Sequence, residues 1–171
     1  MQYDPRHTNR PPPPIEPTGF FTGVQLRPVI IGVVVDYVAT HAAMYAFIFG
    51  YLAKELSKNG EVTEEVMFEY MLSPEGLTAA LIIGGLCTVL GGFIAGRKAG
   101  TLELKHGAFV GLGSLIVSFL EQTVRGGSIP LPEWFVFVSV ALVIPEGALG
   151  GFIAGWLRGS GGAAARRRAM P

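Results

Sequence analysis

The sequence predicts an all-α, polytopic membrane protein in which four transmembrane helices form two parallel-repeated helical hairpins, with a short amphipathic helix in the first loop. Of the 171 residues, 50% are hydrophobic and only 15% are charged, whereas a soluble domain averages about 25% charged residues. Apolar stretches long enough to cross a bilayer recur along the chain. The hexapeptide Gly-Gly-Phe-Ile-Ala-Gly occurs twice, at Gly91–Gly96 and Gly150–Gly155, which indicates a duplicated element.

The apolar stretches set the expected boundaries. About 20 helical residues cross a hydrocarbon core of about 30 Å, so we expect a membrane domain over residues 28–158, with spans at 29–53, 74–97, 104–124 and 132–157. Residues 1–27 contain Pro11–Pro14 and are expected to form a disordered cytoplasmic tail, because such a run lacks backbone donors. Residues 159–171, with Arg166–Arg168, are expected to form a basic disordered tail.

The segment between the first two spans carries a helix signal. Thr63 is suited to cap a helix, and Glu64 and Glu65 would lie in its first turn, where the helix dipole favours anions. Apolar residues recur at helical spacing through this segment, at Val62, Val66, Met67, Tyr70 and Met71. We interpret it as an amphipathic helix that rests on the membrane surface or packs against the bundle.

The distribution of Lys and Arg predicts the orientation. Basic residues concentrate near both termini and in the connection between spans two and three, and such residues mark the cytoplasmic side. Both termini are therefore expected in the cytoplasm, and the two spans that carry the hexapeptide would run in the same direction, as a parallel repeat requires. The formal net charge of zero gives no reason to expect a nucleic-acid partner. The expected partners are the lipid bilayer and either further copies of the chain or a larger membrane complex.

Glycines inside the spans predict close helix packing. Helix association in lipid depends on small residues that let backbones approach. Each span carries such residues, and the glycines expected at helix contacts are Gly32, Gly84, Gly85, Gly91, Gly92, Gly96, Gly107, Gly111, Gly147, Gly151 and Gly155. We interpret them as tight packing within one four-helix bundle; the competing interpretation is that some of these faces form the contact of a homodimer, and the glycine spacing alone does not choose between the two.

Three ionisable residues lie deep in the apolar runs. If the first span begins near Pro28 and the fourth ends near Leu157, then Asp36, His41 and Glu146 lie roughly 12, 20 and 16 Å from the same membrane edge. Such groups face the protein interior or a water-filled cavity. One hypothesis makes them a proton- or cation-responsive site, in which two close carboxylates share a proton.

The competing hypothesis is structural, with each carboxyl hydrogen-bonded to Thr40, Thr88, Ser139 or a backbone carbonyl and serving to fix helix register. Pro145, directly before Glu146, removes a backbone donor and frees a carbonyl about one turn earlier. A freed carbonyl beside a carboxylate suits cation or water binding.

No complete catalytic, cofactor or metal motif is found. The three scattered histidines have no metal-ligand spacing, and His106 is expected to be solvated. The sequence therefore favours a non-enzymatic membrane protein that acts as a packing or accessory component, self-associating or bound to a larger complex. The alternative is a small proton- or cation-coupled carrier or channel that uses Asp36 and Glu146.

The segment Gly91–Lys98, which reads Gly-Gly-Phe-Ile-Ala-Gly-Arg-Lys, and its echo at Gly150–Arg158 close the second and fourth spans. In this respect the chain resembles small uncharacterised prokaryotic four-helix integral membrane proteins. The resemblance implies the four-helix architecture and a location in the prokaryotic inner (cytoplasmic) membrane. It implies no activity.

Overall fold

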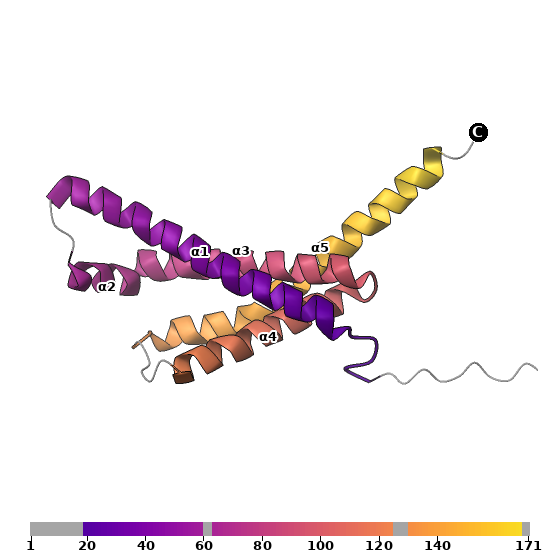
Figure 1. Ribbon diagram of the computed structural model, residues 1–171, viewed down its shortest axis with the longest axis horizontal. Coiled ribbons are helices and arrows are strands. Elements are labelled where there is room, and N and C mark those ends of the chain that lie inside the picture. Colours follow the sequence, from indigo (N-terminus) through magenta and orange to yellow (C-terminus); the bar gives the residue numbers. More distant parts are fainter. Residues whose placement is uncertain (1–18, 60–62, 125–129, 169–171) are drawn as a thin grey trace, which may run out of the picture.

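The computed structural model of the protein describes residues 19–59, 63–124 and 130–168, and of residues 57–59 and 160–168 only the backbone. Within these residues the chain forms five helices and no strand (Figure 1). The helices are α1 (Leu26–Asn59), α2 (Glu64–Leu72), α3 (Pro74–Ala99), α4 (Glu103–Val124) and α5 (Glu133–Arg168).

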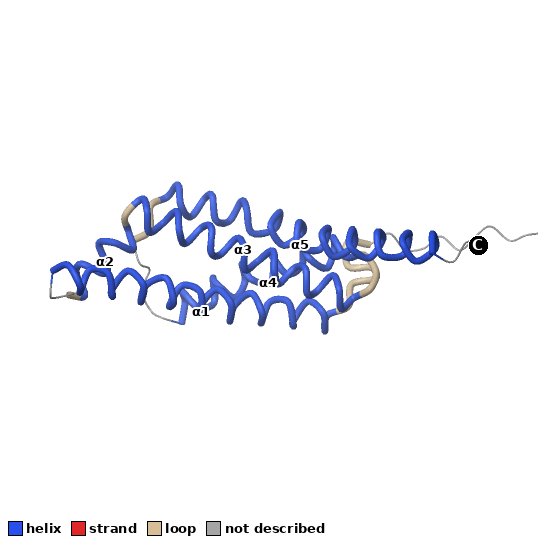
Figure 2. The backbone as a smooth tube through the Cα atoms, turned by 90° about the horizontal axis from the view of Figure 1, so that it is seen from above, coloured by secondary structure: helices blue, strands red, loops and turns tan. Residues whose placement is uncertain are grey.

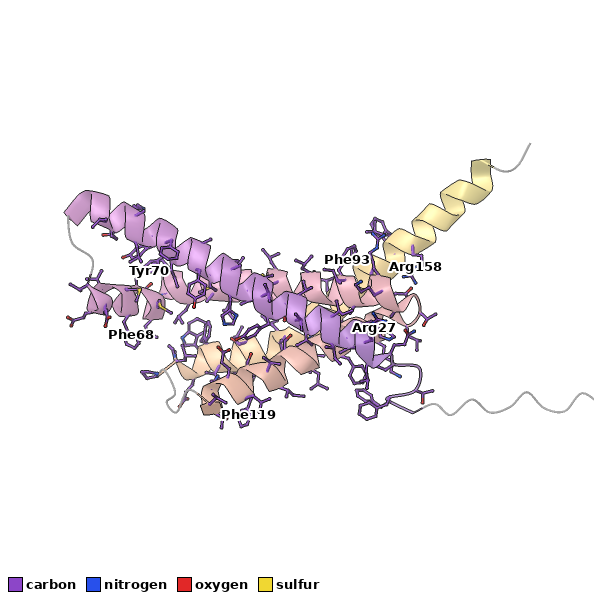
Figure 3. All side chains as sticks on the ribbon, viewed as in Figure 1. Arg27, Phe68, Tyr70, Phe93, Phe119 and Arg158 are labelled. Carbon is purple, nitrogen blue, oxygen red and sulfur yellow. The ribbon has the colours of Figure 1, made fainter. Side chains whose placement is uncertain are left out.

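Four of these helices are long and apolar enough to cross a membrane, over Leu26–Leu56, Pro74–Ala99, Glu103–Val124 and Glu133–Gly159. The prediction of an all-α chain with four such helices is confirmed. The outer faces of the helices agree with it: Phe119 is 70% exposed and Phe137 75% exposed, and Figure 3 shows Phe119 on the outside of the bundle. Large apolar side chains therefore lie on every outer face of the bundle. In water they would form extensive exposed apolar patches, and contact with lipid accounts for them.

The short segments between helices follow from local capping. Ser73 ends α2 and begins α3: its Oγ donates to Tyr70 O (2.7 Å) and accepts from Gly76 N (3.1 Å). Pro74 follows at the first helical position, where its missing N–H is not needed. α3 ends at Gly100, whose φ of 76° lies in the left-handed region.

α2 begins where the sequence indicates. The Thr63 Oγ1 accepts from Val66 N at 3.3 Å and caps the helix. No residue of α2 is buried. The helix contacts the far part of α1 through Tyr70, whose ring stacks on Tyr51 with 3.5 Å between centroids (Figure 3).

The residues before α1 are ordered against the bundle, and the expected disordered tail over residues 1–27 is corrected for its last part. The Lys105 Nζ donates to Gly19 O (3.3 Å) and Thr22 O (2.9 Å). The Phe20 and Phe21 rings lie 5.1 and 5.5 Å from the Phe109 ring. Aromatic contact and a cation on two carbonyls hold the segment, which composition alone does not indicate. Residues 1–18 of the expected tail lie outside the described residues.

The expected disordered tail over residues 159–171 is also corrected. α5 continues to Arg168 and projects beyond the other helices, as both views show (Figures 1 and 2). Residues 163–168 read Ala-Ala-Ala-Arg-Arg-Arg, and Ala and Arg are among the strongest helix formers, whereas residues 159–162, Gly-Ser-Gly-Gly, do not favour a helix. Residues 169–171 lie outside the described part of the chain.

Glycines bring the helices together backbone to backbone. α3 and α5 run in the same direction, because Gly92 faces Gly147 and Gly96 faces Gly151 one turn further along both helices. A Cβ built on Gly92 or Gly147 would lie closer than 3.0 Å to a carbonyl oxygen of the neighbouring helix. The same holds for the carbonyl-facing positions Gly32, Gly91, Gly107, Gly111 and Gly151. All of these contacts lie within one chain. These glycine faces are therefore already occupied and need no second copy of the chain.

Three of the glycines expected at helix contacts make no close approach to a neighbouring backbone. Gly84 has nothing within 4 Å of a built Cβ, and Gly155 would make only an ordinary contact, 3.6 Å from the Glu103 Cβ. Gly85 faces the Glu146 carboxyl group instead of a backbone. Gly150, which was not among the expected positions, does meet a neighbour closely: a Cβ built on it would lie 2.6 Å from Phe93 N of α3. Helix rotation decides these outcomes, because spacing alone does not state which of two adjacent glycines faces a neighbour.

His106 is fully buried, with 0% of its surface exposed, so the expectation that it is solvated is wrong. Its Nε2 accepts from Gln25 N at 2.9 Å, and its Nδ1 lies 3.0 Å from Leu102 O. The neutral imidazole with its proton on Nδ1 satisfies both contacts. His106 therefore ties the segment before α1 to α4.

We expect His106→Leu to loosen this segment. The Gln25 N–H would lose its acceptor, and an unsatisfied buried donor costs about 1–3 kcal/mol. Amide exchange at Thr22, which donates to Gly19 O at 3.0 Å, should become faster by roughly tenfold or more. Lys105→Met provides the comparison, because its exposed contacts should matter less. Unchanged exchange in His106→Leu would contradict the tethering role.

Candidate functional site

A cavity of about 260 Å³ lies between the four long helices. Its lining comes from the middle of α1, the first half of α3, the second half of α4 and the first half of α5. The cavity therefore occupies the half of the bundle where α4 ends and α5 begins. None of the described residues that line it is Lys or Arg, and three are acidic: Asp36, Glu121 and Glu146.

Among the acidic groups that line the cavity, Asp36 accepts hydrogen bonds from several hydroxyl groups. Its side chain accepts from Thr40 (3.3 Å), from Thr88 (3.2 and 3.3 Å) and from the Ser114 hydroxyl. The residue is 4% exposed. Thr40 belongs to α1, Thr88 to α3 and Ser114 to α4, so this carboxylate joins three helices. These hydrogen bonds link α1, α3 and α4 through one side chain, so Asp36 fixes the three helices against one another at the inner end of the cavity.

Two of these three partners, Thr40 and Thr88, are among those expected from the sequence, and Ser114 is not. Thr40 follows from its position one turn after Asp36. Thr88 is among the partners expected for the structural alternative, and the structure brings it to Asp36. Ser114 is a partner that sequence reasoning missed, although its spacing from Gly107 and Gly111 on α4 places it on the same face as those packing glycines.

Glu146 has a different environment. It lines the same cavity, and no hydrogen bond or ion pair from the described residues engages its carboxyl group. A Cβ built on Gly85 would lie only 2.5 Å from the Glu146 Oε1, so the absence of a side chain at Gly85 makes room for this carboxyl group. Glu146 and Asp36 line the same cavity from different helices. Glu146 is thus the carboxyl group that the cavity leaves available.

His41 lies nearer the outer end of the cavity and pairs with an acid that the sequence did not single out. Its Nε2 is 3.5 Å from the Glu121 Oε1, and its Nδ1 is 2.8 Å from Tyr37 O. The Tyr37 and His41 rings lie 4.2 Å apart. Glu121 stands at the end of the third apolar run, where an exposed position is the ordinary expectation. Only the packing of α4 beside α1 brings it to His41.

A smaller cavity of about 190 Å³, lined by Arg97, Ala154, Leu157 and Arg158, lies at the end of the other half of the bundle, but the interior of this half is packed. Its core is Val29, Ala95 and Val110, with Ala95 and Val110 0% exposed. At its end Arg158 of α5 pairs with Glu103 of α4 and donates to Arg97 O of α3 at 3.2 Å. The glycine contacts described above fill the layer between this core and the cavity. Access to the cavity from this side is therefore blocked by backbone and small side chains.

The structure brings together the three ionisable residues that the sequence singled out, since Asp36, His41 and Glu146 all line one cavity. In the described part of the chain no group of three or more His, Cys, Asp or Glu residues is placed to hold a metal ion. The arrangement suits the binding of a proton or of a positively charged solute. Comparison of the chain with known protein families, curated protein sequences and solved structures finds no match.

Proposed function

We propose that this protein is a small proton- or cation-coupled carrier or channel of the membrane, with Asp36 and Glu146 in its binding site. The observation that carries the proposal is a cavity among membrane-spanning helices whose described lining has acidic but no Lys or Arg side chains. A carboxylate at the centre of a bilayer costs about 2.5–3.5 kcal/mol on insertion scales. Two of them at one cavity make a functional use the best explanation of that cost.

The unequal environments of the two acids support this proposal over a purely structural pair. Asp36 receives hydroxyl donors from three helices, as a group that fixes helix register does. Glu146 faces the cavity with no such donors among the described residues. Glu146 is partly buried, and polar groups with only a structural role in a protein interior are normally hydrogen-bonded. The free carboxyl group at Glu146 is instead suited to exchange a proton or a cation.

The setting in the membrane is part of the proposal. Basic residues near both ends and in the α3–α4 connection favour cytoplasmic termini, and the resemblance noted above implies a prokaryotic inner membrane. The cavity would then face the outer side, where α4 ends and α5 begins, and α2 would lie at the outer membrane surface. The repeated hexapeptide, on two helices that run in the same direction, supports an origin of the two hairpins by duplication.

An accessory role in a larger complex is the second candidate, and the extension of α5 favours it. α5 runs past the bundle to Arg168 and offers a helix on which a partner protein could dock (Figure 1). The internal use of the packing glycines weakens the argument for self-association, because those contacts are already made within one chain.

The deciding experiment measures ion movement in vesicles that contain the purified protein. With an imposed membrane potential, we expect flux of protons, Na⁺ or K⁺ for the native chain. Glu146→Gln should lower it by roughly tenfold or more, because removal of one charge from a buried ion contact costs about 2–5 kcal/mol. Asp36→Asn should act in the same direction, and it also weakens the link between the three helices.

Glu133→Gln is the matched control, since it makes the same change on the same helix at an exposed position in the first turn of α5. Its flux should equal that of the native chain. If none of the three ions moves in a manner that depends on Glu146 or Asp36, while the variants insert and melt normally, the carrier or channel proposal is wrong. The accessory role would then be the better account.

A further inference from the structure

We infer that the cavity binds a small organic monocation, a protonated amine with an apolar body, whose ammonium group contacts Glu146 beside Asp36. This inference deepens the proposed function and rests on it for its role in transport. The sequence alone indicates only that the ligand of this site is a proton or a cation. Size, lining and the placement of the acidic groups narrow the ligand to this class.

Size is the first step. A single water molecule needs about 10–15 Å³ of cavity volume, and this cavity has a volume of about 260 Å³. A bare inorganic ion or a proton would leave most of that space to water. A molecule with several heavy atoms would fill it.

The lining is the second step, and it has two parts. Beside the carboxyl groups stand hydrocarbon side chains, among them Val33, Leu81 and Leu142, which favour an apolar body over a column of water. Two aromatic rings, Tyr37 and Phe135, also line the cavity. The faces of such rings attract organic cations.

The coordination that an inorganic cation requires is the third step. Mg²⁺ and Ca²⁺ need six or more oxygen ligands at about 2.0–2.6 Å. No His, Cys, Asp and Glu cluster in the described residues is placed for this, and the Asp36 oxygens already accept from hydroxyls on three helices. One carboxyl group without a hydrogen-bond partner among the described residues, in the same cavity as the Asp36 carboxyl group, matches a single ammonium group, which brings its own donors.

The test is calorimetric titration of the purified full-length protein in detergent with phenethylammonium, which is charged at neutral pH. The neutral isostere 2-phenylethanol is titrated in parallel. We expect binding of the amine, and binding of the alcohol weaker by roughly 30-fold or more, the loss that removal of a desolvated charge pair produces. Glu146→Gln should weaken amine binding by a similar factor, and Glu133→Gln should leave it unchanged. Phe135→Leu should weaken it by about two- to fivefold, because a cation–π contact is lost.

The outcomes separate this inference from the proposed function. If protons or alkali ions move in a Glu146-dependent manner but phenethylammonium does not bind, the ligand class is wrong and the carrier or channel proposal stands. If the amine binds and Glu146→Gln abolishes that binding, but no ion moves in vesicles, the site assignment stands and transport is wrong. Equal affinity for the amine and the alcohol would overturn the inference, since charge would then play no part.

Discussion

Gly92→Ala is expected to destabilise the protein by about 1–3 kcal/mol, or more if the helices are forced apart. The new Cβ would meet the carbonyl oxygen of Gly147 on α5 closer than 3.0 Å, and its other near neighbours are backbone atoms of the same residue. A backbone cannot rotate away as a side chain can. The whole of α5 would have to shift, together with the contacts that Gly147 makes with Gly107 and Gly111 on α4. Unfolding by denaturing detergent in mixed micelles measures the change.

The control lies on the same helix. Gly84→Ala makes the same substitution at a position where nothing lies within 4 Å of the new Cβ. It should be neutral or stabilise α3 by up to about 1 kcal/mol, because Ala favours a helix more than Gly does. Equal stability of the two variants would show that α3 and α5 do not approach as closely as the glycines indicate.

Chemical labelling of a cysteine in the cavity is expected to depend strongly on the side of the membrane. Ser139 lines the cavity, and Ser139→Cys in a chain with Cys87→Ala places a near-isosteric thiol there. A membrane-impermeant maleimide should react from the side where α4 ends and α5 begins. From the other side the reaction should be at least about tenfold slower, because thiol reactivity requires access. On that side the core around Val110 and the glycine contacts close the bundle.

Right-side-out and inside-out membrane vesicles, labelled in parallel, supply the measurement. Ala95→Cys is the companion variant, since Ala95 is 0% exposed and lies in the closed half; it should react from neither side. Equal labelling of Ser139→Cys from both sides would mean a pore that is open throughout, contrary to the closed half seen here. Reaction from the right-side-out vesicles would in addition support the proposed cytoplasmic location of the termini.

The site illustrates how far sequence reasoning reaches into a membrane bundle. A charged residue in an apolar run is recognisable from its neighbours in sequence, so Asp36, His41 and Glu146 stand out without a structure. Their depth in the membrane follows from the helical rise per residue. Because they lie at similar depths, packing of the spans brings them to one cavity. Glu121 was not assigned to this site from the sequence, because it lies at a helix end, where an exposed acidic residue is ordinary.

What the sequence determined by itself was the class of the protein: four apolar helices, the cap at Thr63 and the acidic residues among the spans, because length, composition and capping are local properties. The tertiary structure decided which side chains meet. It put Gly92 and not Gly84 against α5, buried His106 under the segment before α1, and gave hydroxyl partners to Asp36 but none to Glu146 within the described residues. Those outcomes depend on the rotation and register of one helix against another. Spacing along the chain fixes which residues share a face of a helix, and only close backbone contact between helices fixes what that face touches.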